Sequence, residues 1–172
     1  MPVILMPKRG KLIIFMGSKS DSTFASRIGD FLSKEGFPLK YEYNVASAHK
    51  TPEFLIKKVA GYEESDESLV YITIAGLSDA LSGVVAGCSK RPVIACPPDS
   101  EKHGWSKVFS SAMTPTGIPV MFVSTPENAA LAALRILGMN DPSLRKEIES
   151  FHARKRKEIT AADEEMREGE RH

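Results

Sequence analysis

The segment Ser47–Pro52 (SAHKTP) carries the most reactive side chains of this sequence. An imidazole such as that of His49 can take up or release a proton near neutral pH, and the ammonium of Lys50 can neutralise a phosphate. Thr51 and Pro52 are typical of a helix start, where proline fits the first position. The segment therefore predicts an acid/base group beside an anion-binding cation. A surface histidine without a role is the alternative.

The segment Gly17–Asp21 (GSKSD) follows an apolar run and precedes a helical pattern. Hydroxyl groups such as that of Ser18 stand here beside the free N–H groups of a helix N-terminus, which bind anions. A carboxylate repels phosphate, so a sugar hydroxyl is the better partner for Asp21. The same run is also an ordinary helix cap, and it lacks the GxGxxG and GxxxxGKS/T patterns of dinucleotide and P-loop sites.

A third polar segment, Ala75–Gly83 (AGLSDALSG), follows another strongly apolar run. Its polar side chains, Ser78 and Asp79, are candidates for a binding role, and helix capping by either of them is the alternative. The later loop that holds His103 and Trp105 is either a lid or an irregular surface connection.

Apolar runs with strand character alternate with helical patterns through the first 140 residues. The expected strands are Lys11–Met16, Leu39–Val45, Leu69–Ala75, Pro92–Cys96 and Pro119–Val123. The expected helices are Ser22–Glu35, Pro52–Glu64, 78–88, Trp105–Ala112 and Pro126–Leu137. This alternation predicts an α/β fold, a three-layer αβα sandwich with a doubly wound (flavodoxin/Rossmann-like) parallel sheet of about five strands. Ligands of such sheets bind beyond the carboxyl ends of the strands, which is where the three polar segments fall.

Composition excludes several classes of protein. The chain has 172 residues, which suits one domain, and its 23 Lys and Arg against 22 Asp and Glu leave no basic excess for general nucleic-acid binding. Cys88 and Cys96 cannot form a disulfide framework or a familiar zinc site, and both are expected to be small core or near-core residues. The apolar stretch within residues 1–10 precedes its charges, the reverse of a signal peptide, and no apolar run approaches the roughly 18 residues of a bilayer span. We expect a soluble, cytoplasmic protein.

Charge is concentrated at the end of the chain, where 17 of the last 32 residues are charged. An exposed helix is expected there, with an apolar stripe formed by Leu144, Ile148, Phe151 and Ile159. The run Arg154–Lys157 is expected to be a solvated face, because acidic neighbours offset its charge. The sequence thus predicts a single domain over residues 1–172. Its body spans about 11–138, and a charged helical extension at about 141–170 packs on a neighbouring subunit.

Several segments of the chain resemble the PurE family of purine biosynthesis, in the family's order and spacing. They are MGSKSD, SAHKTP, IAGLSDALSGVVAG, PVIACPP, and TPTGIPV followed by ENAALAALRILG, and together they span residues 12 to about 138. The family comprises carboxylation enzymes that act on 5-aminoimidazole ribonucleotide (AIR). The resemblance implies purine biosynthesis as the function class.

The family has two branches, and the sequence resembles the carboxylase branch. That branch uses AIR and CO2 and reads SAHK, GRSNALSG and PVIACPP, whereas the mutase branch rearranges N5-carboxy-AIR and has a second histidine at the position of Ala80. The chain has Lys50 and Ala80, but GLSD (Gly76–Asp79) replaces GRSN. A carboxylate at that point would repel an incoming carboxyl group unless it is protonated or turned away.

The resemblance implies a role for each matching residue. His49 is expected to be the general acid/base. The ribose phosphate and its hydroxyls are expected to be held by Ser18, Asp21, Ser47 and Lys50. Contacts with the ring or carboxylate region are expected from Gly76 and Ser78.

The resemblance also implies what accompanies the protein. No metal, biotin or ATP is expected, CO2 is a co-substrate, and the partner is a small ribonucleotide rather than a nucleic acid or a membrane. The expected assembly is a homo-oligomer, most often an octamer and sometimes a tetramer. Two alternatives remain open: an N5-carboxy-AIR mutase, and a non-enzymatic nucleotide-binding relative.

Overall fold

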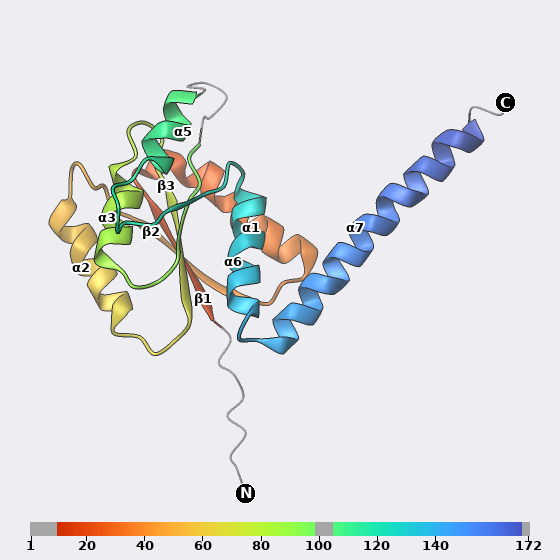
Figure 1. The fold of residues 1–172 in the computed structure, drawn as a ribbon, viewed down its shortest axis with the longest axis horizontal. Coiled ribbons are helices and arrows are strands. Elements are labelled where there is room, and N and C mark those ends of the chain that lie inside the picture. Colours follow the sequence, from red (N-terminus) through yellow and green to blue (C-terminus); the bar gives the residue numbers. More distant parts are fainter. Residues whose placement is uncertain (1–9, 99–104, 170–172) are drawn as a thin grey trace, which may run out of the picture.

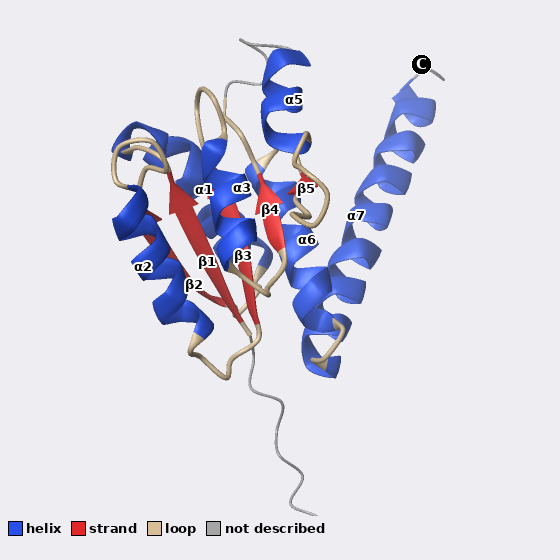
Figure 2. Cartoon of the chain, turned by 60° about the vertical axis from the view of Figure 1, so that its left-hand side comes forward, coloured by secondary structure: helices blue, strands red, loops and turns tan. Residues whose placement is uncertain are grey.

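One parallel β-sheet organises the protein. The computed structural model describes residues 10–98 and 105–169. The strands stand in the order β2-β1-β3-β4-β5 (Figure 2), and every neighbouring pair is parallel. Their bounds are β1 Lys11–Met16, β2 Lys40–Val45, β3 Leu69–Ile74, β4 Val93–Ala95 and β5 Met121–Phe122. The predicted doubly wound sheet of five strands is confirmed.

Strand β5 is shorter than the predicted strand Pro119–Val123. Only Met121 and Phe122 pair with β4, although the Val123 N–H also donates to the Ala95 carbonyl over 2.9 Å. Proline has no N–H group to offer a neighbouring strand, so Pro119 cannot donate to the ladder at its own end. Strand β5 is therefore a short edge strand.

Helices cover both faces of the sheet, as the alternating pattern predicted. They are α1 Ser22–Glu35, α2 Pro52–Glu63, α3 Ala80–Cys88, α5 Trp105–Ala112, α6 Pro126–Gly138 and α7 Pro142–Gly169, with a short 3-10 turn at Lys19–Asp21. Helices α1 and α6 pack on one face, and α2 and α3 pack on the other (Figure 1). The three-layer αβα sandwich with an additional C-terminal helix is confirmed. None of the described helices is long and apolar enough to span a bilayer.

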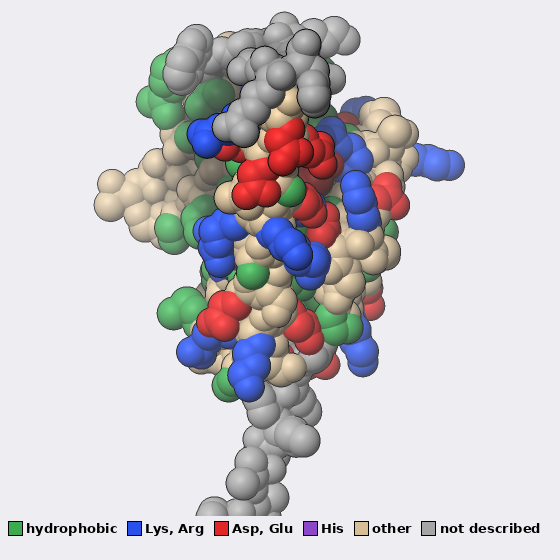
Figure 3. All heavy atoms as spheres, turned by 90° about the vertical axis from the view of Figure 1, so that its right-hand side faces the viewer, with side chains coloured by type: hydrophobic (Ala, Val, Ile, Leu, Met, Phe, Trp, Pro, Cys, Tyr) green, Lys and Arg blue, Asp and Glu red, His purple; other side chains and the backbone are tan. Residues whose placement is uncertain are grey.

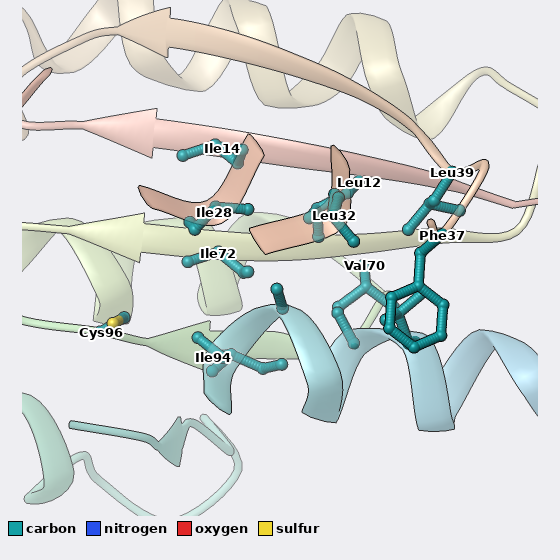
Figure 4. Close-up of a cluster of buried hydrophobic side chains, with 14 of the residues drawn as sticks. Leu12, Ile14, Ile28, Leu32, Phe37, Leu39, Val70, Ile72, Ile94 and Cys96 are labelled. Carbon is teal, nitrogen blue, oxygen red and sulfur yellow. The ribbon is translucent and has the colours of Figure 1, made fainter. Parts of the chain in front are cut away.

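Two hydrophobic cores lie on the two faces of the sheet, and strand β1 contributes side chains to both. Leu12 and Ile14 belong to the core under α1 and α6 (Figure 4), and Ile13 and Phe15 belong to the core under α2 and α3. All four side chains are fully buried. Because successive side chains of a strand point to opposite faces, an uninterrupted apolar run indicates burial on both sides.

Helix α7 packs against the body through its first turns and then extends beyond it (Figure 1). The residues of its predicted stripe that lie in the first core are Leu144, Ile148 and Phe151. Farther along the helix, Arg154 and Lys155 form ion pairs with Glu35 at 3.1 and 3.2 Å. Ile159, the last residue of the predicted stripe, is 73% exposed, because it lies on the part of the helix that extends beyond the body. The face that α7 presents carries acidic and basic side chains interspersed (Figure 3).

The two cysteines lie in different environments. Cys96 is buried in the first core, as expected, whereas Cys88 is exposed, so the expectation for Cys88 is wrong. Cys88 is the last residue of α3 and lies beyond the buried Val85 and Ala86 that hold this helix on the sheet. Burial raises the pKa of the Cys96 thiol to about 12, so this thiol is protonated at neutral pH as well as shielded.

Alkylation is expected to distinguish these cysteines. Iodoacetamide at about pH 8 reacts with thiolates, so the native protein is expected to gain one adduct, at Cys88. Intact-mass measurement followed by peptide mapping checks this. The Cys88→Ser variant is expected to gain an adduct only after unfolding in urea, and labelling of Cys96 in that native variant would contradict the prediction.

Candidate functional site

Three strand-end loops meet at one edge of the sheet. Strands β2, β1 and β3 are neighbours, so the loops that follow Val45, Met16 and Ile74 lie side by side. They enclose a cavity of about 270 Å³. Among its lining residues are all seven predicted site residues, Ser18, Asp21, Ser47, His49, Lys50, Gly76 and Ser78.

The β1 loop forms a reciprocal cap before α1. The Ser18 N–H donates to Asp21 Oδ2 over 3.1 Å, and Ser18 Oγ accepts from the backbone N–H and the hydroxyl of Ser20. A further bond from the Gly17 N–H to the Ile74 carbonyl, 2.8 Å long, ties this loop to the end of β3. Helix capping and a cavity-lining position thus fall on the same residues, so the two alternatives stated for this segment do not exclude each other.

The loop after β2 closes on itself through Ser47 and Thr51. The Ser47 N–H donates to Thr51 Oγ1 over 3.0 Å, and the Thr51 N–H donates to the Ser47 carbonyl over 2.9 Å. Ser47 Oγ accepts from the Lys50 N–H over 3.2 Å. The backbone of this turn is therefore fixed without the side chains of His49 and Lys50, which are both exposed at the cavity. They are available to a ligand.

The carboxylate of Asp79 is turned into the protein, away from the cavity lining. Asp79 is 7% exposed, and its oxygens accept from the Ser82 N–H at 3.0 Å and the Ser82 hydroxyl at 2.6 Å. Ser82 Oγ in turn lies 2.7 Å from Thr73 Oγ1 of β3. Asp79 is thus the cap of α3, the role that the sequence left open between Ser78 and Asp79. Asp79 is not among the residues that line the cavity.

Gly76 lies where two loops approach each other. A Cβ atom at this position would stand 3.4 Å from Asp21 Oδ1 and 3.9 Å from Pro98 Cγ, at the limit of ordinary van der Waals contact. The loops that follow β1 and β3 therefore approach each other closely at Gly76.

One residue beside the site was missed by the sequence reasoning. Lys107 of α5 is 2% exposed, and its ammonium donates to the carbonyl oxygens of Ala75 and Leu77 in the β3 loop. A lysine in an amphipathic helical pattern ordinarily indicates a solvated position. No local signal marked Lys107, because its burial depends on the packing of α5 against a loop thirty residues earlier.

Some expected candidates are not tested by the geometry. His103 and His172 lie outside the described residues, as does the stretch 1–9. Within residues 10–98 and 105–169, no three or more His, Cys, Asp or Glu side chains are grouped as a metal site would require. His152 lies on α7, where its Nε2 is 2.9 Å from Arg135 Nη2.

Comparisons with known proteins agree on one family. The family model described as AIR carboxylase matches residues 11–158. A phosphoribosylaminoimidazole carboxylase of Archaeoglobus fulgidus is 43% identical over 157 residues, covering 91% of this chain and 85% of its own. An N5-carboxyaminoimidazole ribonucleotide mutase of Methanocaldococcus jannaschii is 38% identical, covering 91% of this chain and 98% of its own. The crystal structure of Treponema denticola PurE superposes with a TM-score of 0.86 at 38% identity, covering 91% and 98% of the two chains.

Proposed function

We propose a function from one established premise: this chain belongs to the AIR carboxylase family, the PurE proteins. On that premise we propose that it is an AIR carboxylase of purine biosynthesis. It joins CO2 to C4 of the AIR imidazole to give 4-carboxy-AIR, and it also catalyses the reverse decarboxylation. The observation that supports the proposal most strongly is the single cavity lined by all seven candidate residues.

The substrate is assigned to the cavity by charge and hydrogen-bonding capacity. Lys50 neutralises the phosphate, and the hydroxyls of Ser18 and Ser47 donate to its oxygens. The carboxylate of Asp21 accepts from the ribose hydroxyls. The aminoimidazole ring then lies against the β3 loop, in contact with Gly76 and Ser78.

His49 is the proposed general acid/base. The exocyclic amine makes AIR an electron-rich enamine, so C4 attacks the carbon of CO2 while one C=O electron pair moves to oxygen. Neutral His49 then takes the C4 proton and restores the aromatic ring, and in the reverse direction its imidazolium returns that proton to C4. Such a proton transfer contributes about 10²–10⁴-fold, and the orientation of both reactants in one cavity contributes further. This electron flow calls for no ATP, biotin or metal.

An N5-carboxy-AIR mutase is the second candidate. It is supported by the 38% identity to a relative that bears that name. Ala80, the first residue of α3, has no group that could carry a proton at the position where the mutase pattern has a second histidine. That difference favours the carboxylase. A third candidate, a nucleotide-binding relative without activity, is suggested by Leu77 and Asp79, although the Asp79 carboxylate serves as a helix cap.

A side-by-side assay tests these candidates. The purified protein is incubated without ATP, once with AIR and ¹³C-bicarbonate and once with N5-carboxy-AIR, and 4-carboxy-AIR is measured by mass spectrometry. We expect labelled product from AIR, at a rate that exceeds the conversion of N5-carboxy-AIR. Faster conversion of N5-carboxy-AIR would instead establish the mutase. Binding of AIR with no product from either substrate would establish the non-enzymatic relative.

We also propose that the protein is a cytoplasmic homo-oligomer, an octamer or else a tetramer. The support is the part of α7 beyond the Arg154–Glu35 ion pair, where the apolar Ile159 and Met166 are exposed at 73% and 68%. A long helix with exposed apolar residues is suited to contact with a second subunit. Light scattering coupled to gel filtration measures the assembly, and a monomeric mass would contradict the proposal.

A further inference from the structure

Two side chains of helix α5 bind the backbone of the β3 loop, the segment 75–79 that follows strand β3, at every second residue. The ammonium of Lys107 donates to the carbonyl oxygens of Ala75 and Leu77. One turn later, Ser110 Oγ accepts from the Asp79 N–H over 2.8 Å. The backbone at positions 75, 77 and 79 is thus bound by two side chains of one short helix.

The loop lines two cavities, so packing alone does not fix its position. Leu77 and Ser78 line the site cavity and also a second cavity of about 320 Å³, whose other lining residues are Ser106, Lys107 and Ser110. A loop next to two open spaces can shift unless hydrogen bonds hold it. Burying an ammonium group is unfavourable without such bonds, and here Lys107 gives its protons to two carbonyls of this loop.

The same contacts orient two N–H groups. No peptide bond among the described residues is cis, and in a trans peptide the C=O and N–H point in opposite directions. The carbonyls of Ala75 and Leu77 point to Lys107, so the N–H groups of Gly76 and Ser78 point away from it. Among the described residues neither of these two N–H groups has an acceptor, and both residues line the site cavity.

We propose that Lys107 is a positioning residue for carboxyl transfer. It fixes the peptide units Ala75–Gly76 and Leu77–Ser78, and its charge polarises them, so that the two N–H groups donate more strongly to the carboxylate that forms at C4. The inference rests on the proposed function. To that function the inference adds Lys107, a residue that does not touch the substrate and acts through the backbone of the loop.

The replacement Lys107→Met tests the role in catalysis. Loss of an organised anion-binding donor lowers kcat by about 10²–10³-fold in other enzymes, and we expect a decrease of about 10²-fold in AIR carboxylation. The affinity for AIR, which has no carboxylate, is expected to stay within about threefold, while the affinity for 4-carboxy-AIR falls about tenfold. Lys107→Arg keeps the charge and is expected to recover part of kcat. Lys90→Met, at an exposed position between α3 and β4, is the matched control and is expected to behave as the parent protein.

Amide hydrogen exchange tests the positioning without any activity. We expect the peptide covering residues 75–82 to exchange at least about tenfold faster in Lys107→Met than in the parent, with β1 and α6 unchanged. If the parent protein does not carboxylate AIR, the proposed function fails, and the exchange measurement still decides whether Lys107 holds the loop. Unchanged exchange together with kcat within threefold of the parent overturns the inference.

A second variant covers the case in which Lys107→Met does not fold. Ser110→Ala removes only the acceptor for the Asp79 N–H and leaves the ammonium in place. We expect faster exchange of the same peptide and a decrease in kcat of about threefold to tenfold, smaller than for Lys107 because a neutral hydrogen bond is weaker than a charge-assisted one. A Ser110→Ala protein with parental exchange and kcat overturns the inference.

Discussion

Replacing His49 with Asn is expected to lower turnover of AIR and 4-carboxy-AIR by about 10²–10⁴-fold, the range typical of a lost general acid/base. Asparagine keeps a polar side chain of similar length but cannot carry the C4 proton. The turn itself is held by Ser47 and Thr51, so its shape is expected to survive the change. The affinity for AIR, measured by calorimetry, is therefore expected to remain within about threefold.

The matched control for this change is His152→Asn, which removes a histidine from α7 and leaves the site intact. It is expected to retain parental turnover. Decarboxylation of 4-carboxy-AIR in D2O reports on the proton transfer directly, because the hydrogen that reaches C4 comes from the general acid. In His49→Asn, deuterium incorporation at C4 is expected to slow in parallel with turnover. A His49→Asn protein that turns over at more than a tenth of the parental rate would remove His49 from the mechanism.

Replacing Asp79 with Ala is expected to destabilise the protein by about 2–3 kcal/mol, the combined effect of losing a helix cap and leaving the buried Ser82 hydroxyl with one partner fewer. Because Asp79 anchors the end of the β3 loop, kcat/KM is expected to fall as well, by about tenfold. Urea unfolding at fixed protein concentration measures the first effect, and the side-by-side assay measures the second.

The replacement Asp79→Asn separates the cap from the charge. An asparagine oxygen can still accept from the Ser82 N–H, so the loss of stability is expected to stay below about 1 kcal/mol and turnover within about threefold. The residue of the carboxylase pattern at this position is itself an amide. A large gain in activity from Asp79→Asn would mean that the carboxylate acts on the substrate, contrary to its buried position beside Ser82.

Much of this site could be predicted from sequence because its residues interact mainly with groups a few positions away in the chain. GSKSD and SAHKTP each follow a strand directly, and parallel strands deliver such loops to one edge of the sheet. Capping patterns are also local: the roles of Ser18 and Asp21 before α1, and of Thr51 and Pro52 before α2, involve backbone groups within four residues. The same is true of β1, whose apolar run predicted burial on both faces.

Other features depended on contacts between distant segments. The choice of Asp79 over Ser78 as the cap of α3 rests partly on Ser82 reaching Thr73 in the neighbouring strand. Cys88 is more exposed than expected, because the residue type alone does not show which residues of a helix lie beyond the surface that the helix covers. The shortness of β5 likewise depends on its neighbour β4, because only Met121 and Phe122 find pairing partners there, Ile94 and Ala95.

The sequence by itself determined the fold class, the three loops and the family resemblance, because strand alternation and loop motifs are properties of neighbouring residues. Only the tertiary structure decided that Asp79 turns away from the site and that Lys107 is buried against the Ala75 and Leu77 carbonyls. The direction of a charged side chain is set by which partners desolvate and satisfy it. For Lys107 those partners lie about thirty residues away along the chain, beyond the reach of any local pattern.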